Sequence, residues 1–127
     1  MSTPSAWHIQ LFAQAANAPV RWRLLSGNNR DMGRGTDEFD DAESARVALK
    51  QLQVDAADLV PRVRRVSPSS WQWEIALDDI AIASAGHAFD RLIRCEQGMT
   101  QFLANFANAP IGNAVMLTES RRWRAAS

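Results

Sequence analysis

Hydrophobic and polar residues alternate along short stretches in each half of the chain, and in each half these stretches precede a longer stretch with helical spacing. Alternation places successive side chains on opposite faces of a β-strand. The predicted strands are 7–12, 20–25 and 31–35 in the first half and 62–66, 71–77 and 80–85 in the second. Both halves therefore have the pattern strand, strand, strand, helix.

The helical stretches of the two halves match when the chain is shifted by 50 residues, which places Phe39 on Phe89. Small and apolar residues then coincide at positions that step by three, one, three and four, the spacing of one face of an α-helix. The matched positions are 45, 48, 49, 52 and 56 against 95, 98, 99, 102 and 106. With one further residue of shift, Trp22 lies on Trp73, so we interpret the chain as an internal repeat.

Each predicted helix is preceded by an aspartate that could accept hydrogen bonds from the free amides of the first turn. Asp40 and Asp90 are the predicted N-caps. Glu43 stands three residues after Asp40, so the first helix is predicted to begin with a capping box.

The predicted fold class is α+β, with two tandem β-β-β-α repeats at about 7–56 and about 62–108. A three-stranded unit covered by one helix has little core of its own, so we expect the repeats to share one antiparallel sheet, with both helices on one face and pseudo-twofold symmetry. Residues 1–127 form a single domain in this interpretation. The segment 109–127 is a C-terminal extension, in which 114–118 is predicted to add an edge strand.

The order and spacing of these features resemble the YegP-like family, a bacterial family of unknown function. In the first half the resemblance rests on Trp22-Arg23-Leu24, the turn Asn28-Asn29 and Phe39. In the second half it rests on Trp73-Glu74-Ile75, Asp78-Asp79, Ala83-Ser84, Phe89 and Gly98-Met99. The resemblance implies a duplicated strand-strand-strand-helix fold and brings with it no activity and no catalytic residue.

Composition and charge narrow the classes of function. The chain has 127 residues, of which 46% are hydrophobic, and 14 basic residues balance 14 acidic ones. A net charge of zero gives no long-range attraction to nucleic acid or to an anionic membrane. No apolar stretch approaches the roughly 18 residues of a membrane helix, and residues 1–7 lack a secretory signal pattern. We therefore expect a cytoplasmic protein without a membrane partner.

The chain offers few residues for metal or nucleophilic chemistry. His8, His87 and Cys95 lie far apart, so we expect no metal and no cofactor. Cys95 falls on the apolar helical stripe and is predicted to be a buried side chain. The two glycines in 31–35 indicate a bulge or a close approach of the backbone, and we expect Gly98 to let its helix approach the sheet.

Without a catalytic constellation, the favoured function is a non-enzymatic interaction module that binds a protein or peptide, as a monomer with internal pseudo-symmetry. The first alternative is nucleic-acid binding, because arginines interleaved with tryptophan suit a phosphate backbone and stacked bases. The candidate binding residues for this surface are Arg21, Arg23, Arg62, Arg64, Arg121, Arg122, Trp123 and Arg124. The second alternative is a small-molecule-binding or enzymatic protein with a pocket at the junction of the repeats.

Overall fold

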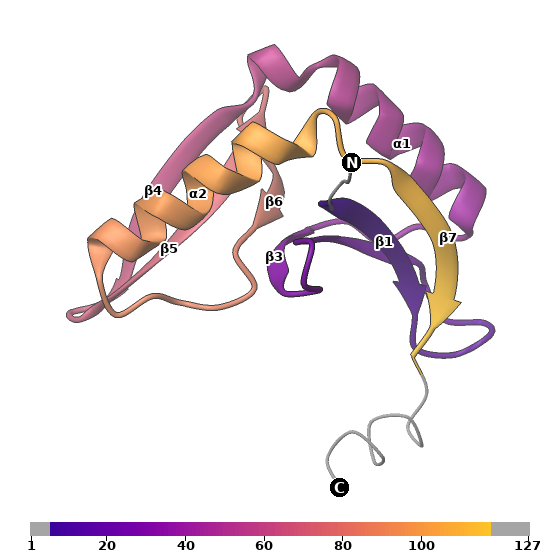
Figure 1. Ribbon diagram of the computed structural model, residues 1–127, viewed down its shortest axis with the longest axis horizontal. Coiled ribbons are helices and arrows are strands. Elements are labelled where there is room, and N and C mark those ends of the chain that lie inside the picture. Colours follow the sequence, from indigo (N-terminus) through magenta and orange to yellow (C-terminus); the bar gives the residue numbers. More distant parts are fainter. Residues whose placement is uncertain (1–5, 118–127) are drawn as a thin grey trace, which may run out of the picture.

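A computed structural model describes residues 6–117 as two α-helices on one seven-stranded sheet (Figure 1). The elements are β1 (His8–Ala13), β2 (Arg21–Leu25), β3 (Asp31–Gly35), α1 (Ala42–Val54), the short 3-10 turn η1 (Ala56–Asp58), β4 (Val60–Ser67), β5 (Ser70–Leu77), β6 (Ile80–Ser84), α2 (Leu92–Phe106) and β7 (Ile111–Met116). The α+β class is confirmed. The six strands predicted before the two helices are present within a few residues of their expected ends.

The strand order is β4-β5-β6-β3-β2-β1-β7, and β7 is the exception to the expected antiparallel sheet because it runs parallel to β1. Its direction follows from where α2 ends. The amide of Ile9, at the start of β1, donates to the carbonyl of Pro110 at 2.8 Å. The chain therefore enters β7 beside the first residues of β1 and continues along it, ending with Ala13 opposite Met116.

Two hairpins of the sheet carry the same irregularity. Leu24 and Leu25 pair with Gly33 and Asp31, so Met32 is an extra residue in β3. Ile82 is the extra residue of β6, where the partner strand β5 changes register between Ile75 and Ala76. Such β-bulges increase the local twist and bend the strand that carries them.

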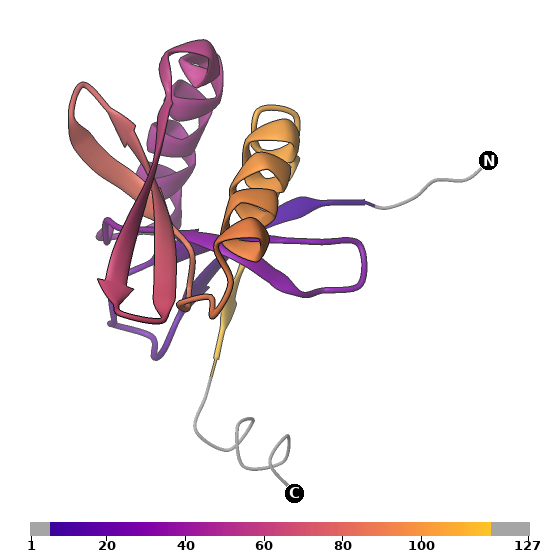
Figure 2. The same ribbon diagram turned by 90° about the vertical axis from the view of Figure 1, so that its left-hand side faces the viewer.

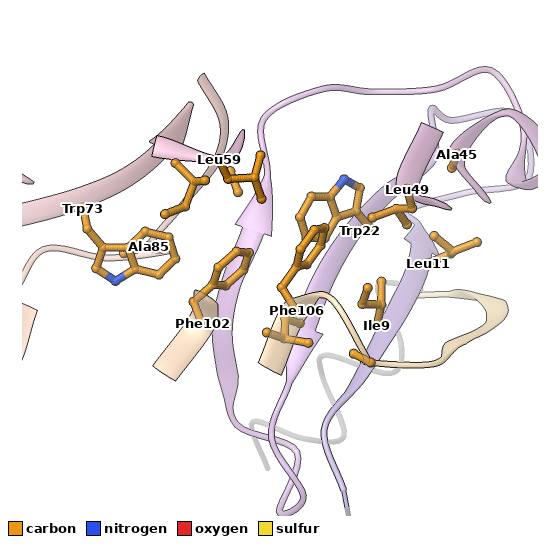
Figure 3. Close-up of a cluster of buried hydrophobic side chains, with 14 of the residues drawn as sticks. Ile9, Leu11, Trp22, Ala45, Leu49, Leu59, Trp73, Ala85, Phe102 and Phe106 are labelled. Atoms are coloured by element: carbon orange, nitrogen blue, oxygen red, sulfur yellow. The ribbon is translucent and has the colours of Figure 1, made fainter. Parts of the chain in front are cut away.

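The core lies between the sheet and both helices, and aromatic rings fill its centre (Figure 3). Trp22 of β2 and Trp73 of β5 are each 1% exposed, and between them lie Phe102 and Phe106 of α2. The ring centroids of Trp73 and Phe102 are 5.0 Å apart, and those of Trp22 and Phe106 are 5.5 Å apart. Ala45 and Leu49 of α1 belong to the same cluster, so one core serves both helices. Figure 2 shows the two helices beside each other.

The central strand β3 presents two glycines to this core, as the sequence predicted. A Cβ on Gly35 would lie 2.2 Å from Nε1 of Trp22, and a Cβ on Gly33 would lie 2.7 Å from both Phe102 and Trp73. Gly33 also has a φ of +148°, which L side chains rarely adopt. The large rings therefore pack directly on the backbone of β3.

Both predicted helix caps are wrong. Asp41, one residue after the predicted Asp40, caps α1 and accepts from the amide of Ser44 at 2.8 Å. The delay arises because Phe39 is still paired with Val20, and the chain needs the next two residues to turn into the helix. The N-cap of α2 is Arg91, whose side chain makes no capping hydrogen bond.

Candidate ligand-binding cleft

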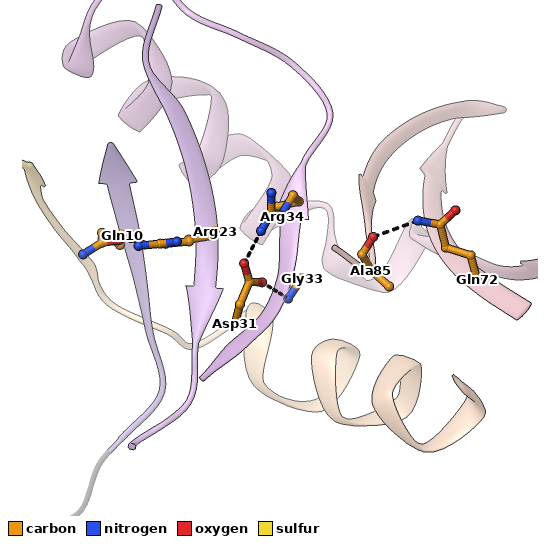
Figure 4. A network of polar contacts seen from close by, with 7 residues as sticks. All are labelled: Gln10, Arg23, Asp31, Gly33, Arg34, Gln72 and Ala85. Carbon is orange, nitrogen blue, oxygen red and sulfur yellow. Dashed lines mark hydrogen bonds and ion pairs between the residues drawn. The ribbon is translucent and has the colours of Figure 1, made fainter. Parts of the chain in front are cut away.

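The sheet is weakly joined at its centre, where β3 meets β6. Only Arg34 and Gly35 pair there, with Ser84 and Ala83, and Thr36 extends the junction at one end by donating to the carbonyls of Ile82 and Ala81. At the other end Ala85 bonds to β5 instead, donating to the carbonyl of Trp73 at 3.1 Å and accepting from Gln72 at 3.0 Å (Figure 4). The two halves of the sheet therefore separate at that end.

A cleft of about 750 Å³ opens where they separate. Its walls come from segments that are distant in sequence: the β2–β3 turn, the segment that follows β6 and one face of α2, together with Trp7 before β1 and Trp73 of β5. The lining residues are Trp7, Ser26, Asn28, Arg30, Asp31, Met32, Trp73, Ala85, Gly86, His87, Ala88, Phe89, Asp90, Arg94, Gln97, Gly98 and Gln101. The volume lies within the range of about 300–1,000 Å³ that is common for small-molecule sites.

The base of this cleft contains a buried hydrogen-bond donor. Trp73 is 1% exposed, and its Nε1 has no acceptor among the described residues. Its neighbour across the cleft is Gly98 of α2, where a Cβ would lie 3.4 Å from Nε1 and 3.4 Å from Cζ of Phe89. An indole N–H left without an acceptor costs about 1–3 kcal/mol when buried, so this position is suited to an acceptor from outside the chain.

Gly98 lies against Trp73 of β5 and Phe89, and the expectation that it lets its helix approach the sheet stays a prediction. A contact of 3.4 Å is ordinary van der Waals distance, so a methyl group would fit. A methyl group at this position would lie in contact with the indole N–H. In the first half of the chain, Ala48 stands at the position that matches Gly98.

Among residues 6–117, some charged side chains of the cleft have an ion-pair partner and others have none. Asp31 accepts from the guanidinium of Arg34 and from the amide of Gly33, the latter at 3.0 Å (Figure 4). Arg30 and Arg94 have no ion-pair partner within the described part of the chain. His87 stacks on Phe89, with ring centroids 4.4 Å apart.

The four predicted arginines of the sheet lie on the face away from the helices, on two separate strands. Arg21 and Arg23 are on β2, whereas Arg62 and Arg64 are on β4. The strand order places β3, β6 and β5 between them, which corresponds to about 19 Å at a spacing of about 4.8 Å per strand. The other four predicted residues, Arg121, Arg122, Trp123 and Arg124, lie outside the described residues.

Most of the charge on this face is already engaged. One row crosses six strands, in the order Arg62, Glu74, Ser84, Arg34, Arg23 and Gln10. Within it Arg62 pairs with Glu74 at 2.7 Å, and Nε of Arg23 donates to Gln10 at 2.8 Å. The guanidinium of Arg23 also lies 4.9 Å from the ring centroid of Phe12. The face is therefore a mixed polar surface and not a continuous basic one.

The structure also bears on the cysteine, the metal site and the membrane helix considered from the sequence. Cys95 is fully buried in the core, and burial, with a smaller contribution from the charge of Glu96, raises the pKa of its thiol. Among residues 6–117, no group of three or more His, Cys, Asp and Glu side chains is arranged to hold a metal ion. No helix in the same range is long and apolar enough to cross a membrane.

Two solved structures are similar to this chain. The solution NMR structure of UPF0339 protein SO3888 from Shewanella oneidensis has a TM-score of 0.66 at 12% identity, covering 90% of this chain and 93% of that one. The solution NMR structure of yegP from E. coli, a protein of unknown function, has a TM-score of 0.65 at 14% identity, covering 89% and 97%. The fold is YegP-like. The sequence itself matches no family model and no curated protein.

The YegP-like fold confirms the resemblance at the level of architecture and brings no activity with it. The cleft was the least predictable part, because its walls come from segments that are distant in sequence. One signal was available in the sequence: a glycine inside a helix costs about 1 kcal/mol relative to alanine. Gly98, opposite Ala48 in the matched helix, is such a glycine.

Proposed function

We propose that this protein is a non-enzymatic binding module whose ligand site is the cleft between the two halves of the sheet. The ligand is a small molecule that presents an oxygen acceptor to the indole N–H of Trp73. The observation that carries this proposal is the buried Nε1 without an acceptor among the described residues, beside Gly98 at the base of the cleft.

The shape of the molecule favours a small molecule over the protein or peptide partner that the sequence favoured. A strand-like peptide would add to a free edge of the sheet. The edge strand β4 carries Pro61, Arg62, Arg64 and Arg65, and proline and charge on an edge oppose such pairing. The cleft instead offers a concave site with apolar and polar walls.

The polar row on the open face also weakens the case for nucleic acid. Binding to a phosphate backbone draws its affinity from basic side chains that are free to displace counterions. Arg62 is paired with Glu74, Arg34 with Asp31, and Arg23 is held by Gln10. The remaining free charge on this face comes from Arg21 and Arg64, on separate strands.

Binding without catalysis is supported by the surroundings of His87, the one histidine of the cleft. A general acid or base needs a partner that fixes its orientation and tautomer. The imidazole contacts the ring of Phe89, and no hydrogen bond joins it to another residue of 6–117. We infer that it forms part of the wall of the site.

We further propose that the chain is a tandem of two β-β-β-α units, about 7–56 and about 62–108, related by pseudo-twofold symmetry. The bulges at Met32 and Ile82 support this, as do two matched bridges, Val20 with Phe39 and Trp71 with Phe89. An experimental structure tests it. The two units should superpose with both bulges at equivalent positions, and bulges at different positions would contradict the duplication.

The binding proposal is tested by screening a library of small metabolites for ligands that raise the melting temperature. Hits should stabilise the wild-type protein and fail to stabilise Gly98→Ala, because the added methyl occupies the space beside Nε1. Thr100→Ala is the matched control, since Thr100 is exposed on the same helix and outside the cleft. Hits that stabilise Gly98→Ala as well as wild type, or no hits at all, would refute the cleft as the site.

A further inference from the structure

We infer that the ligand of this cleft is an organic oxyanion, whose carboxylate or phosphate group is held by Arg30, Arg94 and the indole N–H of Trp73. This inference rests on the proposed function and names the chemical class of its ligand. It follows from the charges of the cleft, from the beginning of α2 and from the apolar part of the walls.

The charged side chains at the cleft, counted together with the ion-pair partner of Asp31, give it a net positive charge. Its Arg, Lys, Asp and Glu side chains are Arg30, Arg94, Asp31 and Asp90. Asp31 is neutralised by its ion pair with Arg34, which lies outside the lining. Two arginines then face one free carboxylate, that of Asp90. Guanidinium groups recognise carboxylates and phosphates through paired N–H donors.

The first turn of α2 adds further donors on the same side. In α1 the carboxylate of Asp41 accepts from the amide of Ser44. The matched positions in α2 are Arg91 and Arg94, and Arg91 makes no capping hydrogen bond. Asp90, directly before the N-cap, is the one acidic side chain beside this end of α2, and no acidic residue lies in the first turn, so the positive end of the dipole favours further negative charge there.

Nε1 of Trp73 has no acceptor and Arg30 and Arg94 have no ion-pair partner among the described residues, while the apolar walls require a ligand that also has an apolar part. Trp7, Met32 and Phe89 are partly buried and line the same cleft. An inorganic ion would satisfy the donors and leave these side chains uncovered. A ligand in which an aromatic or aliphatic body carries the oxyanion satisfies both.

The test uses three probes that share a phenyl ring, namely benzoate, phenyl phosphate and neutral benzamide, with binding measured by isothermal titration calorimetry. Wild-type protein should bind at least one anion about tenfold or more tightly than benzamide, as expected when hydrogen bonds to a charged group are lost. The tighter anion identifies the head group as carboxylate or phosphate. Arg30→Gln and Arg94→Gln should each weaken anion binding by about tenfold and leave benzamide unaffected.

Arg64→Gln is the control, because Arg64 is an exposed arginine of the opposite face without an ion pair among the described residues. It should bind the anions as wild type does. The inference is overturned if neither benzoate nor phenyl phosphate binds more tightly than benzamide, if no probe binds, or if Arg64→Gln and Arg94→Gln show equal losses. In each case the proposed function is judged separately, by whether library hits still lose their effect in Gly98→Ala.

Discussion

The indole of Trp22 lies directly on the backbone of Gly35, so closely that a Cβ at this glycine would be 2.2 Å from Nε1 of the ring. Gly35 is in β3, the strand that joins the two halves of the sheet through its pairing with β6. Trp22 is 1% exposed and contacts Phe106 of α2. The ring therefore links the central strand to the helix that also forms a wall of the cleft.

Gly35→Ala is expected to destabilise the protein by about 1–3 kcal/mol, the range for overpacking a filled core. The φ of Gly35 is not in the left-handed region, so the effect is steric. Urea unfolding followed by tryptophan fluorescence measures it. Gly112→Ala in β7 is the control, because its Cβ would meet only the carbonyl oxygen of Ile9, at 3.6 Å. Equal stability of the two variants would contradict the packing described for Trp22.

The turn between β5 and β6 is strained for the residues it contains. Asp78 and Asp79 have φ values of 52° and 69°, which corresponds to a two-residue type I′ turn between the paired residues Leu77 and Ile80. The double change Asp78→Asn with Asp79→Gly supplies the residues that this turn favours and is expected to stabilise the protein by about 1 kcal/mol.

The melting temperature measures this gain. Ser69→Gly is the control, because Ser69 lies in the turn between β4 and β5 without a positive φ. It should lower the melting temperature or leave it unchanged. A stabilisation of the same size from Ser69→Gly would show that the left-handed conformation at 78 and 79 is not the cause.

The N-cap of α1 makes stability depend on pH. Hydrogen bonds from Ser44, first from its backbone amide, lower the pKa of Asp41 below its usual value. The folded state therefore binds this proton less readily than the unfolded state. The contribution of Asp41 is fully present above the unfolded pKa of about 4 and is lost as the pH falls through the lower folded pKa.

Asp41→Ala should therefore lower the free energy of unfolding at neutral pH, and its difference from wild type should shrink in acid. Urea unfolding at a series of pH values measures this difference. Asp40→Ala is the matched control, since Asp40 is exposed and does not cap the helix. The capping role of Asp41 would be contradicted if the stability difference between Asp41→Ala and wild type stayed constant with pH. It would also be contradicted if Asp40→Ala showed the same difference.

Cys95 is expected to resist thiol reagents in the folded protein. Burial raises the pKa of its thiol, and the thiolate is the reactive form. Reaction with a chromogenic disulfide reagent should be slow in buffer and rapid in urea. In Thr100→Cys, a second thiol exposed on the same helix should react at once, which gives one fast and one slow phase. A fast phase in the wild-type protein would contradict the burial of Cys95.

The sequence predicted local elements well because period-two and helical spacings depend only on neighbouring residues. The strand 31–35 has the predicted bounds, and the matched positions of Trp22 and Trp73 lie on the core face. The predicted N-cap of α1 was wrong by one residue, because a bridge between Phe39 and Val20 holds the chain extended there. That bridge joins residues far apart in sequence, so local signals do not reveal it.

The parallel β7 and the cleft depend on longer-range geometry. The direction of β7 follows from where α2 ends relative to Ile9, and the cleft follows from the short junction between β3 and β6. The four arginines of β2 and β4 were candidate binding residues, but their separation and the pairing of Arg62 with Glu74 depend on the strand order. Gly98 of α2 was recognised as unusual, whereas its neighbour Nε1 of Trp73 lies on β5, which is distant in sequence.

The most direct test of the cleft is an NMR titration of the indole N–H groups with the tightest ligand from the screen. The five tryptophans give five indole signals, and Trp73→Phe assigns the one of interest. The account predicts that the Trp73 proton moves downfield as the ligand is added to wild-type protein and stays in place in Gly98→Ala. A ligand that binds while the Trp73 signal remains unmoved would contradict the site proposed here.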